Sequence, residues 1–270
     1  MRPLTLGWLT LLEAPPADVV RAAAAAKFDA VSLRITGRTP DDPHPTVVGD
    51  AGALRALKSE LDASGLPLTS ASIYHLYPAI GLDQVLPALE ASAALGARAV
   101  VVTCMDPDEA RWTAFVAACC DRAADFGLWL ALEFTPYSEA RTLEQGARIV
   151  RNAAQPNFGL LVDSLHLARS GGKPSDLSDL KGGEVVFAQL CDAAAKTPTG
   201  MDLAAESRRG RRYPGDGALP LADFMKALPA GTVIEIETPR ADVAHLPLAE
   251  QASHAADAAR RFLGSLEDPG

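Results

Sequence analysis

The sequence has few of the residues on which several protein classes depend. It contains 4 cysteines and 5 histidines in 270 residues, and aromatic side chains make up 6%. No C-x-x-C spacing occurs, and the adjacent Cys119 and Cys120 are poor candidates for bridging each other. The cysteine pattern therefore predicts no disulfide framework and suits a reducing compartment such as the cytoplasm.

Basic residues are also in deficit, and long apolar runs are missing. Lys and Arg number 25 against 34 Asp and Glu, for a formal net charge of -9, whereas binding to a nucleic-acid backbone needs a basic surface. No apolar run reaches the roughly 18 residues of a membrane span. The apolar N-terminal stretch is short and stops at Glu13, so we interpret it as a strand with its loop and not as a signal peptide. We expect a cytoplasmic protein without nucleic-acid or membrane partners, and the sequence leaves a homo-oligomer open.

The chain alternates regularly between two kinds of segment, one typical of strands and one typical of helices. Hydrophobic residues make up 48% and charged residues 22%, enough for a sizeable core. Short β-branched or apolar runs predict eight strands, at 4–9, 28–34, 67–74, 97–103, 127–134, 157–163, 184–190 and 232–237.

Alanine-rich stretches lie between these strands and follow the last one. They predict helices at 18–27, 51–64, 82–95, 108–126, 143–152 and 248–263. Gly65, Gly96 and Gly127 stand where helix C-caps are expected. Strand–helix alternation indicates a parallel sheet, and eight units favour a closed (β/α)8 TIM barrel occupying residues 1–270 as a single domain. A doubly wound open sheet is the alternative, although no G-x-G-x-x-G follows the first strand.

Polar side chains stand at the ends of the last four predicted strands. They are Glu133, Asp163, Gln189 with Asp192, and Glu235 with Glu237. In a TIM barrel the C-terminal ends of the strands form the active-site mouth. Carboxylates crowded there raise one another's pKa unless a positive charge lies between them, and a divalent cation is the simplest remedy. Oxygen donors from carboxylates and an amide suit Mg2+ or Mn2+.

The second half of the chain resembles the sugar phosphate isomerase/epimerase branch of the xylose isomerase-like TIM barrel superfamily. The matching segments lie in order over 128–240 and read "LALEFTPYSEARTLEQG", "NFGLLVDSLHLARSGG", "FAQLCDA", "RRGRRYPGDGALPL" and "IEIETPR". The resemblance implies one divalent metal ion per chain, with ligands Glu133, Asp163, Gln189 and Glu237. Many relatives have histidine in place of Gln189, whereas hydroxypyruvate-isomerase-like members have glutamine.

The choice of metal ligand on the last strand rests on the alternation of side chains between the two faces of that strand. Glu235 and Glu237 point to the same side of the strand because side chains alternate with a period of two. Both should face the barrel interior, with Glu237 nearer the mouth, so we prefer Glu237 as the ligand.

The residues expected to contact substrate come from the loops. By the resemblance, His166, on the loop after Asp163, contacts substrate or a ligand, although it could instead cap the next segment. Arg169 has a similar role or a structural one. Arg211 precedes the stiff turn "YPGDG" and matches a substrate-binding arginine, with Arg208 as a second candidate. An arginine cluster can equally be a solvated face.

The first three strands offer weaker candidates for the mouth. His75 in "SIYHLYP" is the best of them, and Glu13 and Arg34 are the others. An ordinary loop position is an equal explanation for each.

The implied site suits proton transfer beside a carbonyl group. A metal bound to the carbonyl and hydroxyl oxygens of a polyhydroxy carbonyl compound lowers the pKa of the neighbouring C–H. Glu133 and Glu237 then act as catalytic acid and base. The result is isomerisation or epimerisation of a keto-sugar, or else loss of a β-hydroxyl, as in dehydratases of the 3-dehydroshikimate or inosose type. A phosphodiester-cleaving barrel of the endonuclease IV type would need more histidines, and a non-catalytic binding barrel would not need the ligand quartet.

Overall fold

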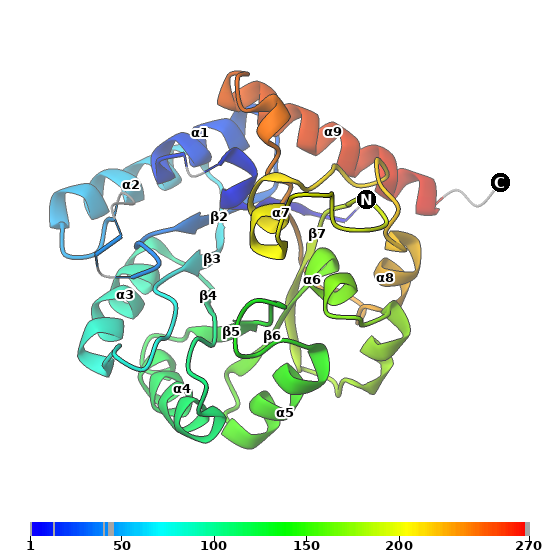
Figure 1. Ribbon diagram of the computed structural model, residues 1–270. Helices are drawn as coiled ribbons and strands as arrows, with labels where there is room; N and C mark the ends of the chain where they lie inside the picture. Colours follow the sequence, from blue (N-terminus) through cyan, green and yellow to red (C-terminus); the bar gives the residue numbers. More distant parts are fainter. Residues whose placement is uncertain (1, 13, 40, 43–45, 268–270) are drawn as a thin grey trace.

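The computed structural model describes residues 2–12, 14–39, 41–42 and 46–267, and its strands close into a barrel. All neighbouring strands are parallel, and the order around the ring follows the chain (Figure 1). The strands are β1 (Leu4–Leu6), β2 (Ala30–Arg34), β3 (Leu68–Ser72), β4 (Ala99–Val102), β5 (Trp129–Glu133), β6 (Phe158–Asp163), β7 (Val185–Leu190) and β8 (Ile234–Ile236). The predicted (β/α)8 barrel is confirmed, as is each of the eight predicted strands.

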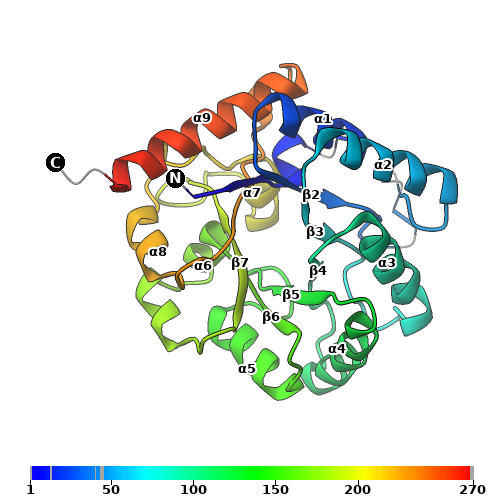
Figure 2. The same cartoon turned by 180° about the vertical axis from the view of Figure 1, so that it is seen from behind.

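The six predicted helices are also present, with ends shifted by at most a few residues. They are α1 (Pro16–Ala25), α2 (Ala51–Ser64), α3 (Leu82–Leu95), α4 (Glu109–Ala124), α5 (Leu143–Ala153) and α9 (Leu248–Glu267). Gly65 and Gly96 adopt positive φ at the C-caps of α2 and α3, as their positions predict. These helices surround the barrel on the outside (Figures 1 and 2).

Three short helices were not predicted, and they lie in the second half of the chain. They are α6 (Ser164–Arg169), α7 (Leu203–Arg209) and α8 (Leu221–Ala227). In Figure 1 α7 lies across the front of the barrel, and in the reverse view of Figure 2 it lies behind it. This helix therefore covers one end of the barrel.

The first strand closes the ring. Its Thr5 is paired with Ala30 on one side and with Glu235 on the other. The strand ends at Leu6, three residues earlier than predicted, because Trp8–Leu11 forms a 3-10 helix. Gly7 makes this turn possible, since a Cβ there would lie 2.8 Å from the carbonyl oxygen of Ile236. The chain thus turns sharply where it passes the end of β8.

The buried apolar side chains of the described residues form three clusters, and the two larger ones follow the alternation of side chains along the strands. On β4, Val100 and Val102 belong to the large cluster shared with the helices. Ala99 and Val101 belong instead to a small cluster inside the barrel, with Ala131, Leu161 and Phe187. The interior cluster comes from three further strands and forms an apolar layer below the polar strand ends.

Two expectations from composition can be compared with the structure. All four cysteines are buried and free, in agreement with the absence of a disulfide framework. Within the described residues, no helix is long and apolar enough to cross a membrane.

Candidate active site

One cavity lies at the C-terminal ends of the strands, where α7 covers the barrel. It is narrow and partly open to solvent. Its wall brings together most of the residues that the sequence singled out. The polar and aromatic lining residues are Trp8, Arg34, Arg38, Ser72, His75, Thr103, Glu133, Thr135, Tyr137, Gln189, Ser207, Arg208, Arg211 and Glu237.

Three oxygen donors of the predicted metal site line this cavity. Glu133 is the last residue of β5, Gln189 is the penultimate residue of β7, and Glu237 follows the end of β8. Gln189 and Glu237 are buried, whereas the side chain of Glu133 is 19% exposed. Glu235 is buried without lining the cavity. The relative depths of Glu235 and Glu237 therefore agree with the preference for Glu237 as the mouth-facing residue.

The fourth predicted donor, Asp163, is buried behind Arg211. Nη1 of Arg211 donates to Oδ2 of Asp163 at 2.5 Å, and both side chains are almost wholly buried. The guanidinium also donates through Nε to the carbonyl of Ser207 and through Nη1 to that of Glu237, at 2.8 and 3.1 Å. Nη2 lies 3.3 Å from Oε2 of Glu237 and 3.2 Å from Oγ of Ser207. All three nitrogens of Arg211 are thus engaged by the protein, although the residue was expected to direct them at substrate.

The buried carboxylates have opposite pKa shifts. Burial raises the pKa of Glu237 well above its usual value. Arg211 lowers this pKa, whereas the nearby charges of Glu133, Glu235 and Asp163 raise it further. Burial likewise raises the pKa of Glu235 to about 7. The pKa of Asp163 is lowered, because Arg211, His166 and a backbone hydrogen bond outweigh the effect of its burial. The site therefore contains more carboxyl groups than Arg211 alone can keep ionised.

The four proposed ligands offer oxygen atoms of the type that a divalent cation binds, although these atoms do not surround a single point. Among the described residues, no three His, Cys, Asp or Glu side chains lie close enough together to hold a metal ion. Yet Oε1 of Gln189 is buried without a hydrogen-bond partner in that part of the chain, which is costly unless a ligand binds it. Each oxygen of Asp163 accepts one hydrogen bond and keeps another lone pair. Hard oxygen donors with unused lone pairs are the chemistry that Mg2+ and Mn2+ require.

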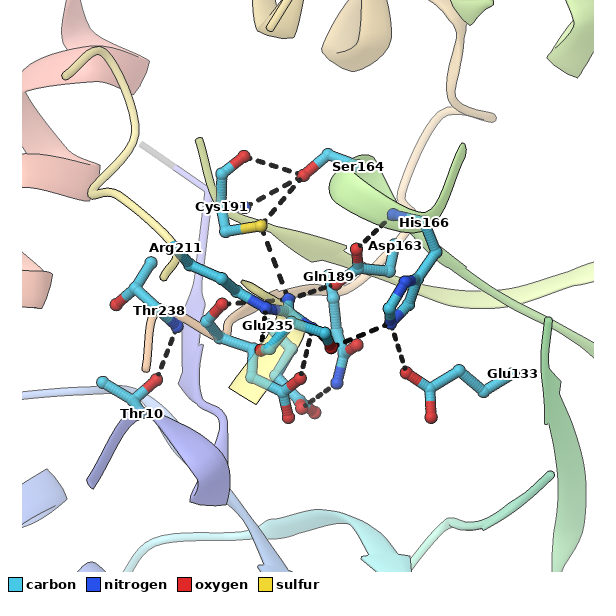
Figure 3. A network of polar contacts seen from close by, with 12 residues as sticks. Thr10, Glu133, Asp163, Ser164, His166, Gln189, Cys191, Arg211, Glu235 and Thr238 are labelled. Carbon is cyan, nitrogen blue, oxygen red and sulfur yellow. Dashed lines mark hydrogen bonds and ion pairs between the residues drawn. The ribbon is translucent and has the colours of Figure 1, made fainter. Parts of the chain in front are cut away.

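His166 lies in helix α6, and the expectation that it stands on a loop is wrong. Asp163 is the N-cap of this helix and accepts a hydrogen bond from the backbone N–H of His166 at 2.9 Å. Nε2 of the imidazole lies 3.5 Å from Oε1 of Glu133 and 3.5 Å from Oγ of Ser207 (Figure 3). The ring of Tyr137 packs on the same imidazole in a T-shaped arrangement, with centroids 5.6 Å apart. His166 is therefore held behind Glu133, away from the open cavity.

Arginine side chains line the cavity as well. Arg34, Arg38 and His75 lie at or just after the ends of β2 and β3, across the ring from β6 and β7, and Arg208 lines the cavity from α7. Burial and the three nearby arginines lower the pKa of His75 to about 3, so its imidazole is neutral at physiological pH. The guanidinium of Arg34 lies 4.8 Å from the ring centroid of Trp8 and donates to backbone carbonyls. His75, the best candidate from the first half of the chain, thus lies in a basic wall.

Arg208 differs from the other arginines of the site. It is partly buried and lines the cavity, and within the described part of the chain it has neither a hydrogen-bond nor an ion-pair partner. Arg169, in contrast, forms two hydrogen bonds with Glu206, at 2.8 and 2.7 Å. Because Glu206 lies in α7, Arg169 fixes that helix over the barrel and has a structural role.

The turn "YPGDG" is held by Asp192, which stands just after β7. Oδ2 of Asp192 accepts hydrogen bonds from the N–H groups of Gly215 and Gly217, at 3.1 and 2.9 Å. A Cβ at Gly217 would lie 2.2 Å from Oδ1 of Asp192, so the contact requires glycine. This strand-end carboxylate fixes the loop and does not face the cavity.

Several lining residues were not identified from the sequence. Arg38 and Tyr137 each follow a strand end by four residues, and Ser207 lies in a helix that was not predicted. The position of Arg38 and Tyr137 on loops at the C-terminal ends of β2 and β5 is the signal that could have found them. Of the weaker candidates, Arg34 lines the cavity, and Glu13 lies outside the described residues.

The family of the chain follows from a comparison with family models. The model described as "Xylose isomerase-like TIM barrel" matches residues 20–265. Among solved structures, a xylose isomerase-like TIM barrel/4-hydroxyphenylpyruvate dioxygenase fusion protein covers all of this chain with a TM-score of 0.79, at 21% identity and over 45% of its own length. The IOLI protein with a binding zinc atom has a TM-score of 0.77 at 20% identity, over 98% of this chain and 97% of its own. At these identities the likeness shows the fold.

Two curated relatives match parts of the chain at higher identity. A 3-dehydroshikimate dehydratase of Pseudomonas aeruginosa is 34% identical over 154 residues, which are 56% of this chain and 22% of that protein. An inosose isomerase of Bacillus subtilis is 33% identical over 110 residues, which are 40% of this chain and 38% of that protein. These matches therefore span much less than two thirds of either relative.

Proposed function

The chain belongs to the xylose isomerase-like TIM barrel family, and we propose that it is a divalent-metal-dependent dehydratase of a carboxylate-bearing cyclic hydroxyketone, of the 3-dehydroshikimate type. The activity named for the Pseudomonas aeruginosa relative supports this proposal. The enzyme class is supported more generally, since relatives with dehydratase, isomerase and epimerase names share the barrel.

The division of the cavity into an acidic and a basic side carries the proposal. Glu133, Gln189 and Glu237 line it from the ends of β5, β7 and β8, whereas Arg34 and Arg38 line it from the end of β2, in the other half of the ring. Arg208 lines it from α7, which covers the barrel. In a protein with a net charge of -9, such local positive charge favours an anionic substrate. A neutral keto-sugar has no group that requires a guanidinium such as that of Arg208, whereas a carboxylate pairs well with one.

The residues that would hold the metal are those on the acidic side. We propose Glu133, Gln189 and Glu237 as ligands that line the cavity, with Asp163 as the fourth ligand through its unused lone pairs. A bound Mn2+ or Mg2+ would polarise the substrate carbonyl and stabilise the negative charge that develops on its oxygen. The zinc atom bound by the IOLI protein, which shares the barrel, supports a metal at this kind of site.

The chain's own residues can carry the proton transfers. Glu133 is the more accessible of the two glutamates, and its Oε1 would remove the proton beside the carbonyl. Glu237 would protonate the departing β-hydroxyl, which leaves as water and gives a conjugated enone. His166, 3.5 Å from Oε1 of Glu133, would hold that carboxylate in place. Arg208 would bind the substrate carboxylate, because its donors are not used by described residues.

Isomerisation or epimerisation of a keto-sugar is the second candidate. It is favoured by the presence of two glutamates at the ends of well-separated strands, β5 and β8, which can remove a proton at one position and return it at another. The inosose isomerase and the solved D-allulose 3-epimerase also support it. The basic side of the cavity makes it the weaker candidate.

An assay that follows both outcomes tests the proposal. Purified protein with added Mn2+ is incubated with 3-dehydroshikimate, inosose and D-allulose in deuterated water, and the products are followed by NMR. Loss of water with formation of an enone or aromatic product from the carboxylate-bearing substrate supports the dehydratase. Deuterium incorporation without loss of water, from a neutral keto-sugar alone, would establish the isomerase or epimerase instead.

A further inference from the structure

The hydrogen bonds of Gln189 depend on a buried residue that lies outside the cavity wall. Nε2 of Gln189 donates to Oε1 of Glu235 at 2.8 Å. The two residues are paired in register on the neighbouring strands β7 and β8, and both side chains are buried. In Figure 3 the nitrogen of the amide faces Glu235, and its oxygen is turned toward the side on which Glu133 lies.

The surroundings of Glu235 make it an acceptor. Its Oε2 accepts a hydrogen bond from Oγ of Ser70 at 3.4 Å, and Ser32 donates to the same carboxylate. Its Oε1 lies 2.8 Å from Nε2 of Gln189, where the amide nitrogen is the donor and the carboxylate oxygen the acceptor. Glu235 therefore pairs with the NH2 end of the Gln189 amide and not with the oxygen end.

An amide side chain has two ends of nearly equal shape, so its orientation has to be fixed by a partner. In this site the fixed end is Nε2, which leaves Oε1 buried and without a partner among the described residues. The buried, unpaired oxygen lies in the wall of a cavity that also contains Glu133 and Glu237. A cation at this position would supply the missing partner of Oε1.

We infer that Glu235 is a positioning residue that orients the Gln189 amide so that its oxygen faces the metal ion. The inference rests on the proposed function, because it requires a cation on the acidic side of the cavity. It assigns Glu235 a role distinct from that of Glu237. Glu235, deeper in the barrel, orients the metal ligand Gln189, whereas Glu237, nearer the mouth, would bind the metal itself. Supporting residues of this kind typically change metal affinity by 10–100-fold when they are replaced.

Mn2+ binding, measured by electron paramagnetic resonance at one fixed pH for all variants, tests the inference without relying on turnover. Glu235→Gln keeps the shape of the side chain but can also donate to Oε1 of Gln189, so it no longer fixes the amide. We expect it to raise the Kd for Mn2+ by roughly 10–100-fold. Ser70→Ala is the matched control, since it removes a weaker hydrogen bond to Glu235 and leaves the amide contact. Its Kd should stay within about twofold of the parent value.

A double-mutant cycle separates orientation of the amide from a general structural effect. In a Gln189→Ala background there is no amide to orient, so Glu235→Gln should cause no further loss of affinity. Unchanged Mn2+ affinity in Glu235→Gln, or losses that simply add in the double variant, would overturn the role of Glu235 while leaving the proposed metal site intact. Failure of the parent protein to bind Mn2+ would overturn the proposed metal dependence and this inference together. Thermal unfolding in chelator verifies that each variant is folded.

Discussion

Arg211 and Asp163 form an ion pair with both side chains about 1% exposed, and Nη1 lies 2.5 Å from Oδ2. The two residues are 48 positions apart in the sequence. The pair joins the end of β6 to the segment that follows α7, directly behind the cavity. A charge left alone in that position would be buried without compensation, so the pair matters for stability as well as for the site.

The first prediction concerns this pair. Arg211→Ala should lower the free energy of unfolding by about 3–5 kcal/mol, because it leaves the Asp163 carboxylate buried without its partner. Urea denaturation measures the change. The matched control is Arg208→Ala, which removes a partly buried arginine without a described partner and should change stability by at most about 0.5 kcal/mol. Equal stability of the parent and Arg211→Ala would mean that the pair contributes little.

The second prediction concerns substrate binding by Arg208. Loss of a charge-assisted contact costs about 1.5–3 kcal/mol, so Arg208→Ala should lower kcat/KM for a carboxylate-bearing substrate by roughly ten- to hundredfold. The same variant should act almost normally on an analogue without the carboxylate. If kcat/KM is unchanged and a folded Arg211→Lys variant shows the loss instead, the substrate contact belongs to Arg211, as the sequence predicted.

The third prediction concerns the metal ligands. Glu133→Gln, Asp163→Asn and Glu237→Gln each replace a carboxylate by a neutral amide of the same shape, which weakens binding of a hard cation. Metal analysis and Mn2+ titration should show strongly reduced binding in each variant, and a chelator should abolish turnover of the parent. His254→Gln, on the exposed face of α9, is the control. Retention of metal by Asp163→Asn alone would remove Asp163 from the ligand set and leave it as the partner of Arg211.

The fourth prediction concerns the pH dependence of stability in the metal-free protein. Glu235 has a pKa of about 7 in the folded state against 4.5 for the free side chain, and the pKa of Glu237 is raised as well. Between these values the folded state holds protons that the unfolded state has released, so stability increases as the pH falls from above 7 toward 4.5. Glu206 and Asp163 have lowered pKa values, and their contribution is lost only at still lower pH. His75, whose pKa is lowered to about 3 from 6.5, acts in the opposite direction below about pH 6.5, because the unfolded state takes up a proton there. We expect the two glutamates together to outweigh this one histidine.

Thermal unfolding in chelator, scanned over pH, measures this behaviour. The Tm should be higher near pH 5 than near pH 8. Glu235→Gln removes one of the titrating groups and should flatten the profile over that range. A Tm that rises steadily from pH 5 to pH 8 in the parent protein would contradict the predicted protonation of the buried glutamates.

The barrel could be predicted from sequence because its elements are long and regular in period. The predicted α2 and α3 agree with the structure residue for residue, and all eight strands were found. The short helices α6 and α7 were missed because a helix of six or seven residues has too few turns for a clear apolar period. Their N-caps, Asp163 and Asp202, were a local signal, but an aspartate after a strand is equally typical of an active site.

The sequence predicted which oxygen-bearing side chains line the cavity. It did not predict which residues form hydrogen bonds with them. Parallel strands end at one edge, so the position of Glu133, Gln189 and Glu237 on one side of a common cavity followed from the strand ends alone. The pairing of Asp163 with Arg211, and of Glu235 with Gln189, depends on the path of a long loop and on register between strands. A sequence period of two places Glu235 inside the barrel and does not indicate which neighbour it contacts.

The closure of the barrel by β1 has a consequence for how the molecule is made. Thr10 donates to the carbonyl of Ile236 across 226 positions of sequence, and β1 has β8 as its second neighbour. During synthesis β1 therefore cannot pair with β8 until β8 has been made. Until then the growing sheet has two unpaired edges. Contacts of such long range slow folding, and open edges invite aggregation in the interval. Because Trp8 and Glu237 of the cavity lie beside this closing seam, the candidate active site is expected to be among the last parts of the protein to form.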